Sequence, residues 1–171
     1  MTTTFMGNLS SYTRFDMVDL DDIRSRTVTA KEYIEKLEGK QGDIFLEKYN
    51  ECTLDSEATN KLAEISDDYV FVVMSAAWCG DCKEMVPTLA KLEEEAGLDV
   101  RVFGGIKTDP LNKDRQWRIP PSPPEMEEWS VTAIPWVTIF DKDGVQRGAI
   151  IEKPRVEDTI EAEILHVLRH K

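Results

Sequence analysis

The chain has 171 residues, 33 of them acidic and 21 basic, which gives a formal net charge of −12 at pH 7. Hydrophobic residues make up 41% of the chain, enough for the core of one globular domain. Because an acidic chain without a face rich in lysine and arginine is repelled by phosphate groups, we do not expect nucleic acid as a partner.

Residues 1–26 show no sustained hydrophobic periodicity, and we assign this first segment no regular structure. Its acidic run from Asp16 to Asp22 is polar enough for an arm or an irregular cover over other elements. Residues 1–17 have neither the basic beginning nor the apolar block of a secretory signal peptide. We therefore expect a cytoplasmic protein.

Three short amphipathic helices are predicted in the next forty or so positions. Thr29 and Glu32 form a capping box at the start of a helix over residues 29–38, which Gly39 is expected to end. A second helix is expected from about Asp43 and a third from about Asp55. Apolar side chains at helical spacing are expected to face inward in these two helices: Ile44, Phe45, Tyr49, Ala58, Leu62 and Ile65.

The pattern changes to that of an α/β core after residue 68. Residues 70–74 form a continuous apolar run, typical of a strand that is covered on both faces. The surrounding apolar stretch, residues 69–78, is far shorter than the ~20 residues of a membrane-spanning helix, so we expect no membrane partner. A helix with Val86, Leu89 and Leu92 inward follows and ends at Gly97, and residues 98–102 alternate like an edge strand.

Two further strands and a last helix complete the predicted core. Residues 136–140 and 145–151 flank the turn signal Asp141-Lys-Asp-Gly144, which predicts an antiparallel hairpin. Pro154 is expected to open a final helix with these side chains inward: Val156, Ile160, Ile164, Val167 and Leu168. The order of elements predicts an α/β sheet with one antiparallel strand pair.

Residues 109–130 separate the second strand from the hairpin. Two short helices are predicted there, over residues 111–117 and 125–129, and the proline cluster of residues 120–124 is expected to be an extended linker.

Residues that can carry chemistry gather after the buried strand, in Trp78-Cys79-Gly80-Asp81-Cys82. Cys79 is expected where the next helix begins, and the unpaired N–H groups and positive dipole of a helix start lower the pKa of a thiol. Cys79 is therefore the predicted nucleophile. Cys82 lies one turn further along and deeper, where it can attack a mixed disulfide, so it is the predicted resolving thiol.

This motif, continued by Lys83, resembles the active site of the thioredoxin family. Pro87 lies where that family has a helix-kinking proline. Ile134-Pro135 ahead of a strand resembles the second hallmark of the family, an isoleucine followed by a cis-proline that faces the dithiol. The resemblance covers residues 55–171.

The resemblance implies a thioredoxin-like fold, a central mixed sheet of about four to five strands flanked by helices, with extra N-terminal helices. We divide the chain into an N-terminal arm and helical extension, residues 1–54, and a thioredoxin-like domain, residues 55–171. Residues implied to shape the substrate site are Trp78, Gly80, Asp81, Ile134, Pro135 and Trp136.

Three features depart from the family pattern. Val73 stands where the family has a buried aspartate, so proton transfer at Cys82 must use water or another group. Asp81 replaces the family's proline, and its carboxylate near the thiolate costs on the order of 1–4 kcal/mol of Coulomb energy at about 4 Å, which opposes the helix dipole. The long separation between Cys82 and Pro135 makes the proline-rich segment an insertion.

Two interpretations of residues 109–129 stay open. The segment either borders the active site and shapes substrate access with Trp117 and Trp129, or it is a surface excursion whose tryptophans pack on the core. Trp136 is likewise either a site-lining residue or a core residue of its strand.

We expect neither a metal nor a bound cofactor. Zinc needs four ligands, and beyond the cysteine pair the chain offers only Cys52, His166 and His170. The dithiol itself carries the two electrons of disulfide reduction.

Two functions of different classes fit these residues. The first is a thiol–disulfide oxidoreductase that acts on protein or small-molecule disulfides through a mixed disulfide on Cys79. The resemblance implies a flavin-dependent thioredoxin reductase as its electron donor. The second is a thioredoxin-fold binding module or slow redox sensor with little turnover. A glutathione-dependent redoxin, which would bind glutathione near Ile134-Pro135, is a further alternative.

Overall fold

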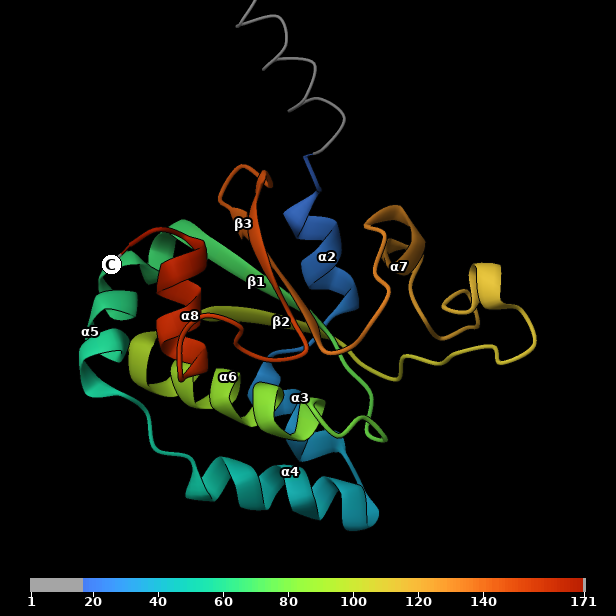
Figure 1. Cartoon of the computed structure of the whole chain (residues 1–171), viewed down its shortest axis with the longest axis horizontal. Helices are drawn as coiled ribbons and strands as arrows, with labels where there is room; N and C mark the ends of the chain where they lie inside the picture. The colour runs from blue at the N-terminus through green and yellow to red at the C-terminus, as the bar shows by residue number, and fades with distance from the viewer. Residues whose placement is uncertain (1–16, 171) are drawn as a thin grey trace, which may run out of the picture.

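The computed structural model describes residues 17–170, and its centre is a mixed four-stranded sheet in the order β2-β1-β3-β4 (Figure 1). Strand β1 runs parallel to β2 and antiparallel to β3, and β4 runs antiparallel to β3. The strands span Tyr69–Met74 (β1), Asp99–Phe103 (β2), Trp136–Asp141 (β3) and Gln146–Ile151 (β4). The predicted fold class, a mixed sheet of four to five strands flanked by helices, is confirmed.

Helices cover the sheet and one another. They span Leu20–Arg26 (α2), Ala30–Lys36 (α3), Gly39–Glu51 (α4), Ser56–Ile65 (α5), Cys82–Ala96 (α6), Glu125–Glu128 (α7) and Ile160–Val167 (α8), with short 3-10 turns at Ser66–Asp68 (η1) and Lys113–Arg115 (η2). In Figure 1, α6 lies below the sheet with α3 and α4, whereas α2 and α7 lie above it. Among the described residues, no helix is long and apolar enough to cross a membrane.

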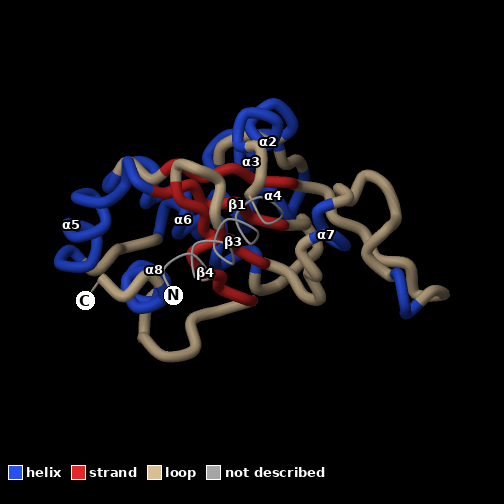
Figure 2. The backbone as a smooth tube through the Cα atoms, turned by 90° about the horizontal axis from the view of Figure 1, so that it is seen from above, coloured by secondary structure: helices blue, strands red, loops and turns tan. Residues whose placement is uncertain are grey.

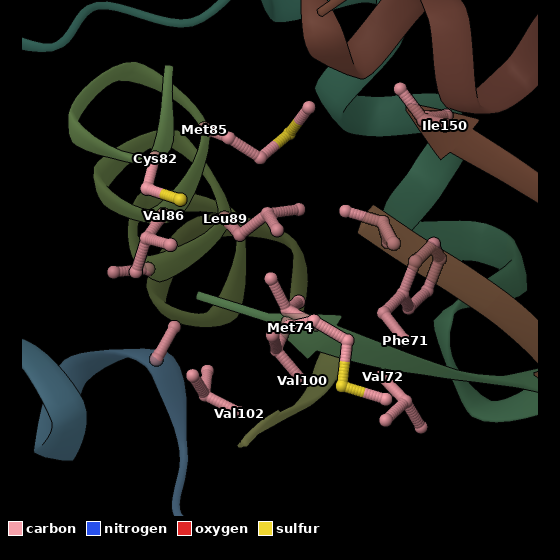
Figure 3. Packing of buried hydrophobic residues seen from close by; sticks show 14 of the residues in the cluster. Phe71, Val72, Met74, Cys82, Met85, Val86, Leu89, Val100, Val102 and Ile150 are labelled. Carbon is pink, nitrogen blue, oxygen red and sulfur yellow. The ribbon is translucent and has the colours of Figure 1, made fainter. Parts of the chain in front are cut away.

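Strand β1 is the centre of the core because both of its faces are covered. Residues 70–74 are at most 3% exposed. Figure 3 shows Phe71 on the side of α6, while Val72 and Met74 point to the opposite face. The continuous apolar run that predicted a strand buried on both faces is therefore explained by helices above and below it.

The extension packs against α6 and begins with one helix that the sequence did not predict. Helix α3 has the predicted capping box, in which Thr29 Oγ1 accepts from Glu32 N and a Glu32 carboxylate oxygen accepts from Thr29 N. Residues 20–26, expected to be irregular, form α2, because Asp19 caps the helix by accepting from Asp22 N at 3.2 Å. The rest of the predicted arm, residues 1–16, lies outside the described residues.

Helix α4 begins four residues before the predicted start at Asp43, and one of its expected core residues is exposed. Phe45 and Tyr49 are 0% and 7% exposed, as predicted, but Ile44 is 37% exposed. Gly42 is buried instead, and a Cβ added there would lie 2.6 Å from the carbonyl oxygen of Leu37. Helix α4 thus presents Gly42, Phe45 and Tyr49 to the core, and Ile44 lies beside this face.

The C-terminal helix is shorter than predicted. Helix α8 begins at Ile160, with Thr159 as its N-cap, and Val156 is 63% exposed rather than inward. Residues 155–157 instead donate their backbone N–H groups to the carboxylate of Glu163. These bonds satisfy the loop backbone without a helix. Ile160 and Ile164 are buried as expected.

Candidate active site

Three loops meet at one edge of the sheet. Because β1 and β2 are parallel, the loops that follow them leave from the same edge, and the antiparallel β3 begins there, with Trp136 paired to Met74. The loops are the dithiol loop (residues 75–81), the insertion loop (residues 104–124) and the segment before β3 (residues 130–135). Figures 1 and 2 show the insertion loop projecting beyond the sheet on the side of α7.

Cys79 and Cys82 form a disulfide, with their Cα atoms 5.3 Å apart. Cys82 is the first residue of α6 and is 0% exposed, whereas Cys79 lies in the loop before the helix and is 6% exposed. The helix thus begins at Cys82, three residues later than the position predicted for its start. The first N–H of the helix, from Cys82, donates to Cys79 Sγ at 3.2 Å. A negative charge on Cys79 Sγ would be stabilised by this donor and by the helix dipole.

The two residues between the cysteines lie on the surface. Asp81 occupies the N-cap position of α6 and is exposed, and its backbone carbonyl accepts from Glu84 N and Met85 N at 3.2 and 3.0 Å. Gly80 is exposed as well, and a Cβ added there would meet no atom within 4 Å. Both residues that separate the cysteines are therefore in contact with solvent.

The segment before β3 faces Cys79. The Ile134–Pro135 peptide bond is cis, and the carbonyl oxygen of Ile134 lies 3.5 Å from Cys79 Sγ. Ile134 is 7% exposed, so it presents mainly its backbone to the disulfide. Trp136 is half-buried, pairs with Met74 and Ile151, and packs against the core. The geometry of Trp136 is therefore that of a strand residue at the border of the site.

Trp78 provides a large exposed surface next to Cys79. Its side chain is 52% exposed, and its Nε1 donates to the carbonyl oxygen of Ile106 at 3.1 Å. Ile106 follows β2 and is fully buried, so the indole is fixed at its polar end and free on its faces. An exposed aromatic side chain of this kind can contact a polypeptide at little entropic cost.

Each of the two interpretations of residues 109–129 agrees with one feature of the structure. The packing of the tryptophans is that of a surface excursion, whereas the position of the loop is that of a segment that borders the active site. Trp117 and Trp129 pack against the core, and the Trp129 ring lies 5.2 Å from that of Phe140. The insertion loop nevertheless borders the dithiol loop, because its Ile106 carbonyl accepts from Trp78 Nε1, and Ser122 bonds to the neighbouring Lys107.

The predicted secondary structure of the insertion loop is only partly present. Only the 3-10 turn η2 forms within the helix expected over residues 111–117. The helix expected over residues 125–129 is present as α7. The prolines, expected to be extended, make a turn that Ser122 N closes by donating to Ile119 O at 2.9 Å. Composition predicted an extended chain, but this hydrogen bond bends it.

A buried hydroxyl pair lies at the end of β1. Ser75 is 0% exposed and its Oγ donates to Tyr33 Oη at 3.1 Å, and burial raises the pKa of Tyr33. Val73, in the position of the family's buried aspartate, is fully buried. Tyr33, Ile106 and Ser122 carry no signal in the sequence that marks them as site residues, whereas Ser75 stands out as a polar residue directly after the apolar run.

The remaining candidate ligands lie elsewhere. The thiol of Cys52 is half-buried and lies 3.8 Å from Thr88 Oγ1, and burial raises its pKa. His170 Nε2 lies 3.0 Å from Tyr69 Oη. No group of three or more histidine, cysteine, aspartate or glutamate side chains converges as a metal site within residues 17–170.

Several solved structures share this fold. A Pseudomonas aeruginosa protein of unknown function superposes with a TM-score of 0.66 at 16% identity, covering 90% of this chain and 97% of that one. An HIV epitope-scaffold superposes with a TM-score of 0.61, also at 16% identity, covering 90% of this chain and 89% of its own. At these identities the likeness concerns the fold.

A family model described as Thioredoxin matches residues 27–164. No curated protein matches the chain. The matched region begins at residue 27, so it includes α3, α4 and α5 as well as the sheet and the disulfide. With most of its length matched and a Cys-x-x-Cys disulfide before α6, the chain belongs to the thioredoxin family.

Proposed function

We propose that this protein is a thiol–disulfide oxidoreductase that reduces disulfides through Cys79 and Cys82. The observation that carries the proposal is the asymmetry of the pair. Cys79 is 6% exposed and receives the first N–H of α6, whereas Cys82 is 0% exposed. One sulfur is thus nearer the surface and electrostatically favoured as a thiolate, and the other is fully buried.

The reaction starts from the reduced dithiol. The Cys79 thiolate attacks one sulfur of a substrate disulfide, forms a mixed disulfide and releases the other substrate sulfur as a thiolate, which takes up a proton. Cys82 then loses its proton and attacks Cys79 Sγ, which releases the second substrate thiol and forms the Cys79–Cys82 disulfide. The substrate gains two electrons from the dithiol and two protons through solvent, one released when Cys79 ionises and one released by Cys82. Water or a nearby hydroxyl must accept the Cys82 proton, because Val73 cannot.

Six residues line or border the disulfide, and their positions support a role in orienting the substrate: Trp78, Gly80, Asp81, Ile134, Pro135 and Trp136. Substrates would be proteins or small molecules that contain a disulfide. The oxidised dithiol must be reduced again, and we propose a flavin-dependent reductase of the thioredoxin-reductase type as donor. A reducing compartment such as the cytoplasm provides such donors.

Reduction of insulin by dithiothreitol tests the proposal. The protein is expected to accelerate the reaction catalytically, with many turnovers for each Cys79. A Cys82→Ser variant should accumulate a mixed disulfide on Cys79 that mass spectrometry detects. A redox sensor or binding module would instead give no turnover above the uncatalysed rate, and that result would refute the proposal.

A further inference from the structure

The insertion loop contacts the dithiol loop through one short backbone segment, residues 105–107. Trp78 Nε1 bonds to the carbonyl oxygen of Ile106, and the next residue, Lys107, bonds twice to Ser122. Ser122 Oγ accepts from Lys107 N at 2.8 Å and donates to the carbonyl oxygen of Lys107 at 3.0 Å. A serine side chain therefore pairs with both backbone groups of Lys107, as a neighbouring strand would.

The segment is also fixed on its other side. Ile106 N donates to the carbonyl oxygen of Ser75 at 3.3 Å. Gly105 has φ +70, and a Cβ added there would lie 3.4 Å from Pro121 Cγ, so the proline turn lies directly against the segment. The position of the Ile106 carbonyl, and with it the direction of the Trp78 indole, thus depends on the proline turn that contains Pro121 and Ser122.

The orientation of Trp78 matters most for large substrates. A polypeptide that presents its disulfide to Cys79 must place neighbouring residues against the exposed indole, whereas a small disulfide needs only the accessible sulfur. Aromatic anchors at the centre of a contact contribute a large share of binding energy when they are held in place.

We propose that Ser122 is a specificity-determining positioning residue for polypeptide disulfides. It holds Lys107 and Ile106, and through them it orients Trp78 beside Cys79. This inference rests on the proposed function, because it names the substrate class that the same site distinguishes.

The test compares Ser122→Ala with the wild-type protein on two substrates, insulin and the small disulfide DTNB. We expect KM for insulin to rise about fivefold with kcat unchanged, the factor that corresponds to a loss of about 1 kcal/mol of binding free energy when Trp78 is less firmly positioned. The rate with DTNB should not change. Ser122→Thr keeps the hydroxyl and should restore KM, and Ser25→Ala, which removes an exposed hydroxyl bonded to the backbone of α2, should have no effect.

Fluorescence provides a second measurement that does not depend on activity. The emission of Trp78 is obtained by subtracting the fluorescence of a Trp78→Phe variant from that of the same protein with Trp78 present. In the Ser122→Ala background, acrylamide should quench this emission more strongly, because the Ile106 carbonyl that accepts from Trp78 Nε1 is no longer held in place. An unchanged KM for insulin, an equal loss with both substrates, or unchanged quenching would each overturn the inference. If the wild-type protein reduced neither substrate, the proposed function would fail, and quenching alone would decide the role of Ser122.

Discussion

The dithiol loop and the insertion loop border the same site but are held in different ways. The disulfide itself depends on near neighbours: Cys79 N donates to Ala76 O and Cys82 N donates to Cys79 Sγ, both at 3.2 Å. Distant segments supply the contacts around it, namely the Ile134 carbonyl at Cys79 and the Ile106 carbonyl at Trp78. The insertion loop is closed by its own bond between Ser122 and Lys107, and α7, which follows the loop, is tied to α2 by Arg26 and Glu125, 99 positions apart in the chain. The geometry of the disulfide is thus local, whereas the surface around it is assembled by the whole fold.

The largest expected effect lies in the dithiol loop. Cys79→Ser should lower insulin reduction by roughly a thousandfold or more, because a serine hydroxyl cannot form the mixed disulfide. Cys52→Ser is the matched control, since it removes the third cysteine of the chain, and its turnover should equal that of the wild type. Turnover assays with dithiothreitol measure both variants. Comparable losses in the two would contradict the assignment of Cys79 as nucleophile.

A smaller effect is expected where the insertion loop is tied to the extension. Arg26 bonds both carboxylate oxygens of Glu125, which is 7% exposed, and stacks 5.1 Å from the centre of the Phe103 ring. Arg26→Ala leaves a buried carboxylate without its partner and should lower the free energy of unfolding by about 1–3 kcal/mol.

Urea unfolding measures this difference. Lys61→Ala, which breaks an exposed pair with Glu57 on α5, serves as the control and should cost about 0–0.5 kcal/mol. Equal losses in the two variants would mean that the bond between Arg26 and Glu125 holds the insertion loop no more firmly than an ordinary surface pair.

Two glycines allow the same substitution to be compared in the two loops. A Cβ at Gly104, in the insertion loop, would collide with the Tyr33 ring, whereas a Cβ at Gly80, in the dithiol loop, would meet no atom within 4 Å. Gly104→Ala should therefore lower the free energy of unfolding by about 1–3 kcal/mol. Gly80→Ala should change it by less than about 0.5 kcal/mol. Thermal or urea unfolding of both proteins gives the comparison, and a reversed order would refute it.

The smallest effect concerns the hydroxyl pair that joins the extension to the end of β1. Tyr33→Phe removes the acceptor of Ser75 Oγ and should cost about 1 kcal/mol, because it leaves a buried hydroxyl unpaired. The double variant with Ser75→Ala should be no less stable than Tyr33→Phe alone, since no unpaired group remains. Urea unfolding of the two single variants and the double variant tests this; additive losses would show that the two hydroxyls do not interact.

Local signals in the sequence predicted the parts of the fold that depend on near neighbours. The capping box of Thr29 and Glu32, the strand of residues 70–74 and the αL cap at Gly97 are all present. The disulfide partners were also predicted, since their spacing places them at the start of one helix.

The errors occurred where a distant or competing partner decided the structure. Helix α2 is an exception, because its N-cap, Asp19, directly precedes the helix but was interpreted only as part of an acidic run. Val156 was predicted in the last helix, but it lies in the loop before that helix, where its backbone N–H donates to the Glu163 carboxylate. Ser122 had no signal at all, since its two bonds reach Lys107 across the insertion loop.

By itself, the sequence determined that the chain forms an α/β fold around a buried strand and carries a Cys-x-x-Cys pair shortly after that strand. Hydrophobic runs, caps and the Cys-x-x-Cys spacing act over a few residues, so they can be recognised along the chain. Only the tertiary structure decided what borders Cys79: the Ile134 carbonyl, the Trp78 indole and the insertion loop behind it. These contacts form when parallel strands bring their loops to one sheet edge. The distances between such loops cannot be inferred from the spacing of residues along the chain.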